Sequence, residues 1–294
     1  MRPDDWHITE DLDDFLARTG DFLRSRPALH TMQLTVTETL RTRGADAYGA
    51  EAPVFGRLER AGEVRATFFF FRTPPGRLNL TPLTPEHADT LAARLAGPGH
   101  PLPGVSAEHD TATAFAEAWQ RHTGATPTLR EQHRLYRLGT LTPPEPLPEG
   151  RGRVAGEQDL EQLRLWYREF AAAIGEVPSA DADSWADTRF ADRRVTLWET
   201  PDGTPVSMAG VTEMIAGQIR VAPVYTPPHL RGRGYAGAVT VEVSRAALAA
   251  GATEVVLFAD LANPTSNSLY QRIGYVPVTD FAGYDFSGAA PEVG

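Results

Sequence analysis

The stretch HLRGRGYAGAV, residues 229–239, constrains the fold of this 294-residue chain more than any other. Its glycines, Gly232, Gly234 and Gly237, follow a run typical of a β-strand and open a run typical of a helix. Small residues let backbone N–H groups turn inward at a helix N-terminus, where these groups and the helix dipole attract anions. The stretch therefore predicts a strand, a tight turn and a helix in that order, with a phosphate group bound at the turn.

Two phosphate-binding interpretations fit these glycines. Read as G-x-G-x-x-G, they match a dinucleotide-binding turn, and Asp260 would then be the acid that binds the ribose. Against this, the residues TPPHLR separate the strand from the first glycine, an antiparallel meander comes before them, and too few residues follow for the remaining parallel strands. The other interpretation is a pyrophosphate cradle of the form R-x-x-G-x-A, Arg231 to Ala236. We favour it over the dinucleotide turn and over a glycine-rich turn without function.

Hydrophobic patterns on both sides of the cradle predict a mixed sheet. Residues 157–174 have apolar side chains at helical spacing, three strands with tight turns follow over 194–225, and a helix over 234–251 leads to a buried strand over 253–260. NPTSNSLYQRI predicts a short helix, and GYVPV with YDFSG closes the sheet. The first half has the same order of elements, and its Phe68–Phe71 run predicts a strand buried on both faces. We expect an α/β (α+β) fold with an internal duplication.

The amino-acid composition excludes several kinds of catalytic chemistry. The chain has no Cys, which removes thiol nucleophiles, disulfides and Fe–S clusters, and no Lys, so all 28 cationic side chains are Arg and Schiff-base chemistry is excluded. The net charge of −10 and the lack of an Arg cluster argue against nucleic-acid binding. No apolar run approaches the ~18 residues of a membrane span, and the acidic N-terminus lacks the core of a secretory signal. We therefore expect no membrane association and a cytoplasmic location.

A proline-rich segment, TLTPPEPLPEGRGRV, divides the chain into two parts of similar length. Such a composition favours extended backbone and is typical of a linker. The expected organisation is a first domain over 1–141, a linker over 142–153, a second domain over 154–287 and a flexible tail over 288–294.

Two blocks of the second domain, VYTPPHLRGRGYAGAVTVEVS and LFADLANPTSNSLYQRIGY, resemble the GNAT acyltransferase superfamily, whose members bind acetyl-CoA. The first block is similar to the acetyl-CoA-binding motif of that family. The second is similar to its downstream motif of a strand, an Asn-led helix and a Gly-aromatic pair. The whole chain resembles a bacterial subgroup in which a degenerate N-terminal GNAT-like domain precedes an intact one. Each domain would then be a mixed, mostly antiparallel sheet flanked by helices, and the first, which lacks the glycine turn, would not bind CoA.

The resemblance implies the cofactor-binding residues and one catalytic residue. The pyrophosphate of acetyl-CoA would be held by the backbone N–H groups of Arg231, Gly232, Arg233, Gly234, Tyr235 and Ala236. The strand end formed by Val224, Tyr225 and Thr226 would pair with the pantetheine arm, and an N–H near Val224 or Tyr225 would face the thioester oxygen.

The short helix NPTSNSLYQRI would complete this site. Asn263 and Asn267 would contact the cofactor, and Tyr270 would protonate the departing thiolate. The spacing places the three on one helix face. Asn263 is expected as the N-cap, with Pro264 at the first helical position. A capped helix with Tyr270 in the core is the alternative interpretation.

The general base is where the sequence departs from the family pattern. Many members carry a Glu on the fourth strand, but this strand reads QIRVAPVYT and has no carboxylate. Glu213, on the preceding strand, is the nearest candidate and would act through water; an exposed acid beside a turn is the alternative interpretation. Asp260 and His229 are further candidates, and an amine that arrives neutral needs no strong base.

A loop rich in acids follows the first helix of the second domain. If it shapes the acceptor site, as in GNAT enzymes, its carboxylates would attract a cationic amine; a solvated loop is the alternative. These acids are Glu176, Asp181, Asp183, Asp187 and Asp192.

The sequence thus predicts an acetyl-CoA-dependent N-acetyltransferase. It would transfer the acetyl group to a primary amine of a small molecule or an amino terminus, by direct attack in a ternary complex and without a metal. One alternative is a catalytically silent acyl-CoA-binding sensor or partner domain. Another keeps the reaction and takes the amine of a thiol precursor, or a peptide, as the acceptor. A homodimer is compatible with the sequence.

Overall fold

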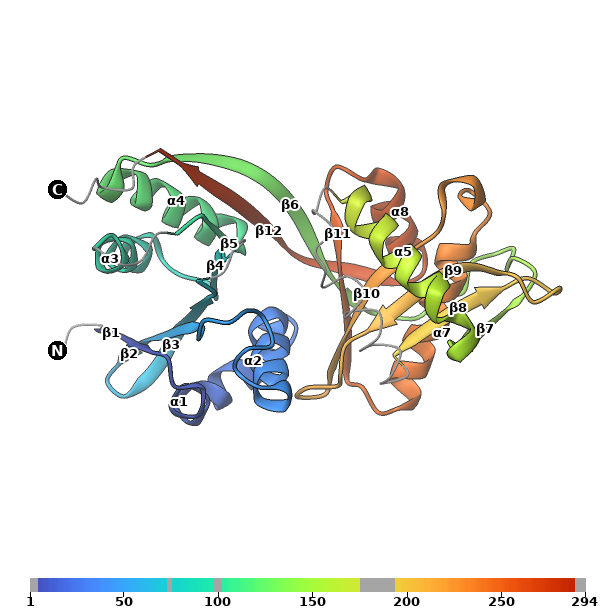
Figure 1. The fold of residues 1–294 in the computed structure, drawn as a ribbon, viewed down its shortest axis with the longest axis horizontal. Coiled ribbons are helices and arrows are strands. Elements are labelled where there is room, and N and C mark those ends of the chain that lie inside the picture. Colours follow the sequence, from blue (N-terminus) through green and yellow to red (C-terminus); the bar gives the residue numbers. More distant parts are fainter. Residues whose placement is uncertain (1–4, 73–75, 98–101, 175–193, 289–294) are drawn as a thin grey trace. The chain divides into compact units, whose positions relative to one another are not determined.

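A computed structural model describes residues 5–72, 76–97, 102–174 and 194–288 of the chain (Figure 1). The acidic loop residues Glu176, Asp181, Asp183, Asp187 and Asp192 lie outside the described residues. The chain divides into two compact units, and each is described by itself. The first consists of Met1–Leu135, Ala259–Ala262 and Val278–Gly294, and the second of Tyr136–Phe258 and Asn263–Pro277.

The first unit begins with one strand, two helices and three strands, followed by a helix, a strand and a helix. In chain order they are β1 (Asp5–Thr9), α1 (Leu12–Arg24), α2 (Thr31–Arg43), β2 (Val54–Arg60), β3 (Glu63–Phe70), β4 (Leu78–Leu80), α3 (Pro85–Leu95), β5 (Gly104–Glu108) and α4 (His109–Thr123). Two long strands, β6 (Thr126–Leu138) and β12 (Tyr275–Ser287), have residues in both units, and so does β11 (Glu254–Asp260).

The second unit contains the cradle. Its elements are β7 (Arg151–Val154), the 3-10 turn η1 (Glu157–Asp159), α5 (Leu160–Ala173), β8 (Val195–Glu199), β9 (Pro205–Val211), β10 (Gln218–Tyr225), the 3-10 turn η2 (Pro228–Leu230), α7 (Tyr235–Ala249), β11 (Glu254–Asp260) and α8 (Pro264–Arg272). The helix, turn and strands expected around the glycines are all present.

The two units repeat one order of strand pairings. In the first, β1 to β4 pair antiparallel in sequence and β4 then pairs parallel with β5. In the second, β7 to β10 pair antiparallel in sequence and β10 pairs parallel with β11. The parallel strands are connected by α3 in one unit and α7 in the other, and α4 and α8 follow. The mixed, mostly antiparallel fold and the internal duplication are confirmed.

The end of the chain differs from the expectation. GYVPV and YDFSG are parts of a single strand, β12, and its residues Phe281–Asp285 pair antiparallel with β5 of the first unit. Residues 278–287 therefore group with the first unit and do not close the sheet of the second. The sequence pattern identifies these residues as a strand, but only long-range packing selects the strand they pair with.

The proline-rich segment is not a free linker. The N–H groups of Gly139 and Thr142 donate to the carbonyls of Gly274 and Ile273 at 2.9 and 3.0 Å, and Trp198 Nε1 donates to the Glu149 carbonyl at 3.2 Å. Its last residues form β7, which pairs with β8. Prolines cannot donate backbone hydrogen bonds, but their neighbours can, and these anchor the segment to the second unit.

Phenylalanines of β3 are buried on both faces, as expected. Phe68 and Phe70 belong to the main core of the first unit, together with Trp6. Phe69 pairs in register with Phe55, whose ring stacks on Phe15 of α1 at 4.8 Å. Helices of the same unit therefore cover both faces of this strand.

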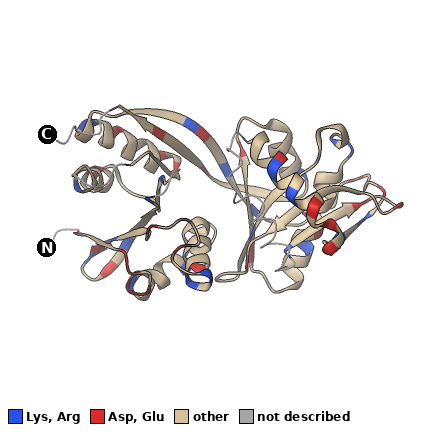
Figure 2. Cartoon of the chain, in the orientation of Figure 1, with Lys and Arg blue, Asp and Glu red and all other residues tan. Residues whose placement is uncertain are grey.

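Charged residues of both signs occur in both units. Acidic and basic residues are interspersed along the elements of both units (Figure 2). None of the helices that the structure describes combines the length and apolarity needed to cross a membrane.

An ion-pair network fixes the first strand of the second unit to the start of α5. Arg153 donates from Nη1 and Nη2 to Asp159 at 2.5 and 2.8 Å, and from Nε to Glu199. Asp159 also accepts the Gly156 N–H at 2.7 Å, and its side chain is 4% exposed. The hydrogen bonds from Arg153 hold the pKa of the Asp159 carboxyl below its ordinary value.

Replacing Asp159 should destabilise the second unit in a pH-dependent way. Asp159→Asn is expected to lower the free energy of unfolding by ~2 kcal/mol at neutral pH, because Arg153 loses a buried carboxylate. A carboxyl whose pKa is lowered on folding stabilises the fold above its unfolded pKa of ~3.9 and loses this effect as pH falls through the folded pKa. Urea unfolding followed by tryptophan fluorescence should therefore show the wild type and variant converging below pH ~4.

The matched control is Glu161→Gln on α5, whose carboxylate pairs with Arg164 at 82% exposure. Its effect should stay within ~0.5 kcal/mol. A gap between wild type and Asp159→Asn that is unchanged in acid would contradict the role given to this carboxylate.

Candidate functional site

The cradle connects β10 to α7 in the second unit. Gly232 and Gly234 have φ of +77° and +83°, a left-handed backbone that a Cβ disfavours. Because of this turn, the N–H groups of residues 232–237 have no acceptor among the residues that the structure describes. A row of unpaired donors at the start of a 15-residue helix has the geometry that anions bind in other proteins.

Two arginines add positive charge to the turn. Arg231 Nε donates to the Thr226 carbonyl at 3.0 Å, and Arg233 Nη2 to the His229 carbonyl at 3.4 Å. These bonds join the two ends of the turn. Within the described part of the chain neither guanidinium forms an ion pair with a carboxylate, so their charge is available to an anion.

Strand β10 leaves its parallel neighbour just before the cradle. It pairs with β11 over Gln218–Arg220, whereas its pairing with β9 continues to Tyr225 with an irregularity between Val221 and Val224. A bulge bends a strand and ends its pairing on one side. In an antiparallel pair, successive residues point their N–H groups alternately toward and away from the partner strand. One of Val224 and Tyr225 therefore directs its N–H away from β9, toward the side that β11 has left.

Ser207 holds the end of this strand in place, which the sequence analysis missed. Its hydroxyl is fully buried, donates to the Tyr225 carbonyl at 3.0 Å and lies 2.8 Å from the Thr226 hydroxyl. The three expected residues Val224, Tyr225 and Thr226 are thus brought together beside the cradle. A lone serine within an apolar strand is the sequence signal that could have revealed such a bond.

Helix α8 begins as expected. Asn263 caps it by accepting the Ser266 N–H at 3.1 Å, and Pro264 occupies the first turn. The Asn267 amide donates to the Asn263 carbonyl at 2.8 Å and accepts from the Tyr136 hydroxyl at 2.8 Å. Both Asn side chains are therefore engaged in holding the helix start.

Tyr270 is buried in an aromatic cluster. Its ring lies 6.4 Å from that of Tyr136 and 6.1 Å from that of Tyr275. Burial raises the pKa of Tyr270 to about 12. Its hydroxyl has no hydrogen-bond partner among the described residues, so it is a protonated donor without an acceptor inside this part of the fold.

Tyr136 was also missed in the sequence analysis. It lies on β6, fully buried, and its hydroxyl accepts from Gln271 Nε2 at 3.1 Å while donating to Asn267. The separation of 131 positions from Asn267 explains why no local pattern reveals the contact.

The carboxylate of Glu169, on α5, contacts the last residue of β10. The Tyr225 hydroxyl donates to Glu169 Oε2 at 2.8 Å, and the Tyr225 ring lies 6.3 Å from that of Trp166. Burial, and then the hydrogen bond to Glu169, raise the pKa of Tyr225 to about 12. The only sequence signal for Glu169 is its spacing of three from Trp166, which places both on one helix face.

The structure does not bring Glu213 to this end of β10. Thr212 bonds with Arg220, and Glu213 itself pairs with Arg194 at 3.6 Å. Ala209, the partner of Val224, lies four positions earlier, which is ~13 Å along the strand at ~3.3 Å per residue. The distance argues against Glu213 as the base.

The other two base candidates have structural roles. Asp260 accepts the Ala262 N–H at 2.8 Å and forms the turn before α8. His229 is exposed, and its carbonyl accepts from Arg233.

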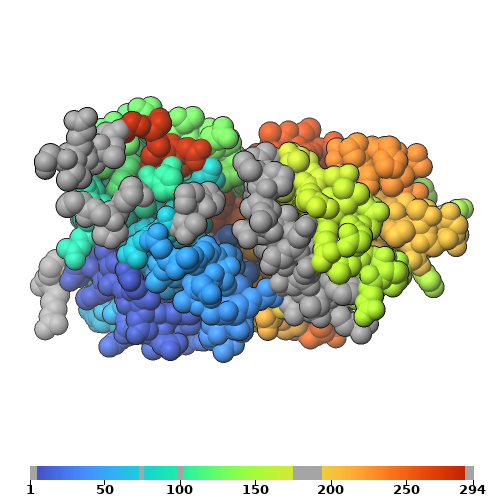
Figure 3. Space-filling view, in the orientation of Figure 1, coloured from blue at the N-terminus to red at the C-terminus, as the bar shows by residue number. Residues whose placement is uncertain are grey.

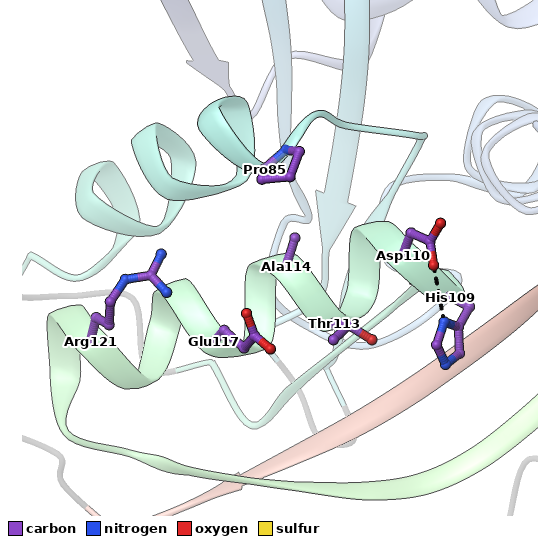
Figure 4. Close-up of a pocket in the computed structure, with 7 residues that line it drawn as sticks. All are labelled: Pro85, His109, Asp110, Thr113, Ala114, Glu117 and Arg121. Atoms are coloured by element: carbon purple, nitrogen blue, oxygen red, sulfur yellow. Dashed lines mark hydrogen bonds and ion pairs between the residues drawn. The ribbon is translucent and has the colours of Figure 1, made fainter.

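The first unit has a different surface where its α3 begins. A groove of about 320 Å³ is lined by Pro85 and by α4 side chains, among them the carboxylates Asp110 and Glu117 (Figure 4). The Thr84 hydroxyl accepts the His87 N–H at the N-terminus of α3, so one of its donors is already used. His109 and Arg121 line the groove together with these carboxylates, so its charge is mixed (Figure 4).

One known protein family matches a segment that lies mostly in the second unit. Residues 207–280, from β9 into β12, match the family described as FR47-like protein. Among curated proteins no significant relative was found.

Solved structures match almost the whole chain. A GNAT-family acetyltransferase from Colwellia psychrerythraea has a TM-score of 0.58 at 11% identity, covering 96% of this chain and 100% of that one. A GCN5-related N-acetyltransferase from Sphaerobacter thermophilus has a TM-score of 0.57 at 19% identity, covering 97% and 96%. The chain has the fold of the GNAT superfamily. A tandem GNAT protein from the clavulanic acid biosynthesis pathway, with a TM-score of 0.53 at 12% identity, covers 98% of this chain and 100% of its own.

The similarity to GNAT structures extends over both units. The tandem GNAT neighbour matches this chain over its full length, as expected from the two-domain resemblance. A dinucleotide-binding fold does not fit, because the strand before the glycines ends an antiparallel meander.

Removing the Tyr136 hydroxyl should loosen α8. Tyr136→Phe leaves Asn267 and Gln271 without a buried partner, so we expect a loss of ~1–3 kcal/mol in the free energy of unfolding. Hydrogen exchange should show faster exchange of α8 amides than in the wild type. Tyr284→Phe, which removes a hydroxyl bonded to Thr113 in the first unit, should leave α8 exchange unchanged. Equal protection of α8 in the wild type and in Tyr136→Phe would contradict this role.

Proposed function

We propose that the protein is an acetyl-CoA-dependent N-acetyltransferase that acts on a primary amine. The observation that carries the proposal is the row of unpaired N–H groups over residues 232–237, placed beside a strand that has left its parallel partner. A diphosphate fits the first feature, and an extended chain with amide groups fits the second. Acetyl-CoA has both, and it supplies the acetyl group as a thioester.

The residues of the cradle would hold the diphosphate. The donors are the N–H groups that follow Arg231, with the two guanidinium groups as additional charge. The left-handed glycines are needed because a Cβ at Gly234 would force the turn out of this conformation. Asn263 and Asn267 hold the start of α8 through their hydrogen bonds and would act as positioning residues for this helix.

The end of β10 would hold the reacting carbonyl. The N–H of Val224 or Tyr225 that points away from β9 would donate to the thioester oxygen as it gains negative charge. Ser207 keeps this N–H in place through the Tyr225 carbonyl. Tyr270, protonated throughout the physiological range, would give its proton to the departing thiolate.

Substitution of one cradle glycine tests the cofactor site. Gly234→Ala should weaken acetyl-CoA binding at least ~10-fold in calorimetry, because the left-handed backbone costs an L-residue ~1–2 kcal/mol and relaxing it turns N–H groups away. The control is Gly251→Ala at the other end of α7, where φ is +93° and an added Cβ meets nothing within 4 Å. It carries the same backbone strain and should bind as the wild type does.

Titration with NAD in parallel distinguishes a dinucleotide-binding turn from a pyrophosphate cradle for acetyl-CoA. Binding of NAD without acetyl-CoA would mean that the dinucleotide interpretation was correct and would overturn the proposal. Equal weakening in both glycine variants would mean that strain, rather than the cradle, causes the loss.

Removing the Tyr270 hydroxyl should slow transfer without weakening binding. Tyr270→Phe is expected to lower kcat ~10²-fold and to change the acetyl-CoA Kd less than ~3-fold, because the hydroxyl acts only on the leaving group. Thiol release is measured with a panel containing a diamine, an aromatic amine, an amino sugar and a peptide with a free amino terminus. Since the pKa of Tyr270 is about 12, the wild-type rate should not fall from its ionisation up to pH ~10.

Tyr275→Phe is the matched control, because Tyr275 is a buried neighbour whose hydroxyl bonds with Ser244 at 2.7 Å. Its kcat should stay near that of the wild type. If acetyl-CoA binds but no amine in the panel is acetylated, the protein is a binding sensor and the enzymatic proposal fails.

A further inference from the structure

The residues around Glu169 lie on the opposite face of the sheet from the cradle helix. Tyr225 pairs with Met208 and Met208 with Leu197, and all three belong to the core cluster that contains Trp166 and Tyr167 of α5. Residues that pair across strands share a face of the sheet. This face is therefore covered by α5, which is yellow-green in the space-filling view (Figure 3).

The neighbouring positions face α7. Trp198 pairs with Ser207 and with Gly152, and a Cβ built on Gly152 would lie 2.4 Å from Glu242 of α7. Ala209 and its partner Val224 alternate with Met208 and Tyr225, so they lie on this second face. A diphosphate at the start of α7 would therefore be on the side of Val224, and the Tyr225 side chain would be on the other.

An acceptor must reach the thioester from a side that the cofactor does not fill. The face of α5 is that side, and Glu169 is the carboxylate that it holds at the end of β10. The Tyr225 hydroxyl is the one hydrogen-bond partner of Glu169 among the described residues, and it leaves the other carboxylate oxygen, Oε1, available.

The Tyr225 ring, whose hydroxyl bonds Glu169, packs near Trp166 of the same helix. Trp166 and Tyr225 are 4% and 5% exposed, and the centroids of their rings are 6.3 Å apart. The Tyr167 hydroxyl lies nearby on the same helix, 3.3 Å from the position of a Cβ added to Gly210. A carboxylate beside buried aromatic rings binds an organic cation through charge and through the ring faces.

We propose that Glu169, held by the Tyr225 hydroxyl, binds a positively charged group of the acceptor other than the amine that is acetylated. This inference rests on the proposed acetyl transfer and names its substrate class. Glu169 is separated from the β10 backbone by the length of the Tyr225 side chain, so a group bound there is held apart from the thioester carbon. The acceptor is therefore a primary amine with a second cationic group several bonds away, as in a diamine or a guanidino amine.

The test compares two acceptors that differ in one charge. The probes are 1,5-diaminopentane and n-pentylamine, with acetyl-CoA at saturation and thiol release as the readout. The wild type should prefer the diamine at least ~10-fold in kcat/KM, since a charge-assisted contact is made by only one of the two. Glu169→Gln should reduce this preference below ~3-fold and leave kcat/KM for n-pentylamine nearly unchanged.

Two further variants separate recognition of charge from stability. Glu161→Gln is the same substitution on the same helix at an exposed position and should keep the full preference. Tyr225→Phe removes the donor that positions Glu169, and should reduce the preference for the diamine over n-pentylamine several-fold.

Each outcome decides between the two proposals. A preference for the diamine that survives in Glu169→Gln would overturn the role of Glu169 while the acetyl transfer stands. A wild type that uses other amines of the panel but shows no preference for the diamine would overturn it as well. If acetyl-CoA binds and no amine is acetylated at all, both this inference and the proposed function fall.

Discussion

The separation of β10 from β11 is the feature on which the candidate site depends. Backbone N–H and C=O groups in a folded chain need partners, and a strand that leaves its neighbour exposes a row of them. Here the parallel pairing covers only Gln218–Arg220, and the glycine turn that follows adds the unpaired donors of residues 232–237. The fold holds these groups in fixed positions through Ser207 and Arg231, which bond the carbonyls of Tyr225 and Thr226. In the function we propose, a ligand with a diphosphate and an amide-bearing arm would bond these groups.

A small local difference distinguishes the candidate binding site at the start of α7 from the corresponding segment at the start of α3. Both connect a parallel strand pair through a helix, α3 or α7, in the same order of elements. At α7 two left-handed glycines open the turn, whereas at α3 the Thr84 side chain caps the helix and acids line the nearby groove. Anion binding at a helix start needs free donors and positive charge, and the start of α7 has unpaired N–H groups beside two arginines.

In the functions we propose, one face of the sheet in the second unit binds the cofactor and the other face recognises the acceptor. Alternation of side chains along β10 sends Val224 toward α7 and Tyr225 toward α5. Cofactor binding and acceptor recognition would thus use neighbouring residues of one strand. Glu169 would supply, from a helix, a carboxylate that the strand itself lacks.

The sequence by itself determined the elements whose cause is local: the glycine turn, the Asn263 cap, the amphipathic α5 and the order of strands that repeats in both halves. These follow from backbone preferences and hydrophobic period, which act over a few residues. Only the tertiary structure decided which strand β12 pairs with, that the proline-rich segment is anchored, that Tyr136 bonds Asn267 and that Glu169 rather than Glu213 lies at the end of β10. Such contacts join residues far apart in the chain, and packing selects them because no local preference distinguishes one partner from another.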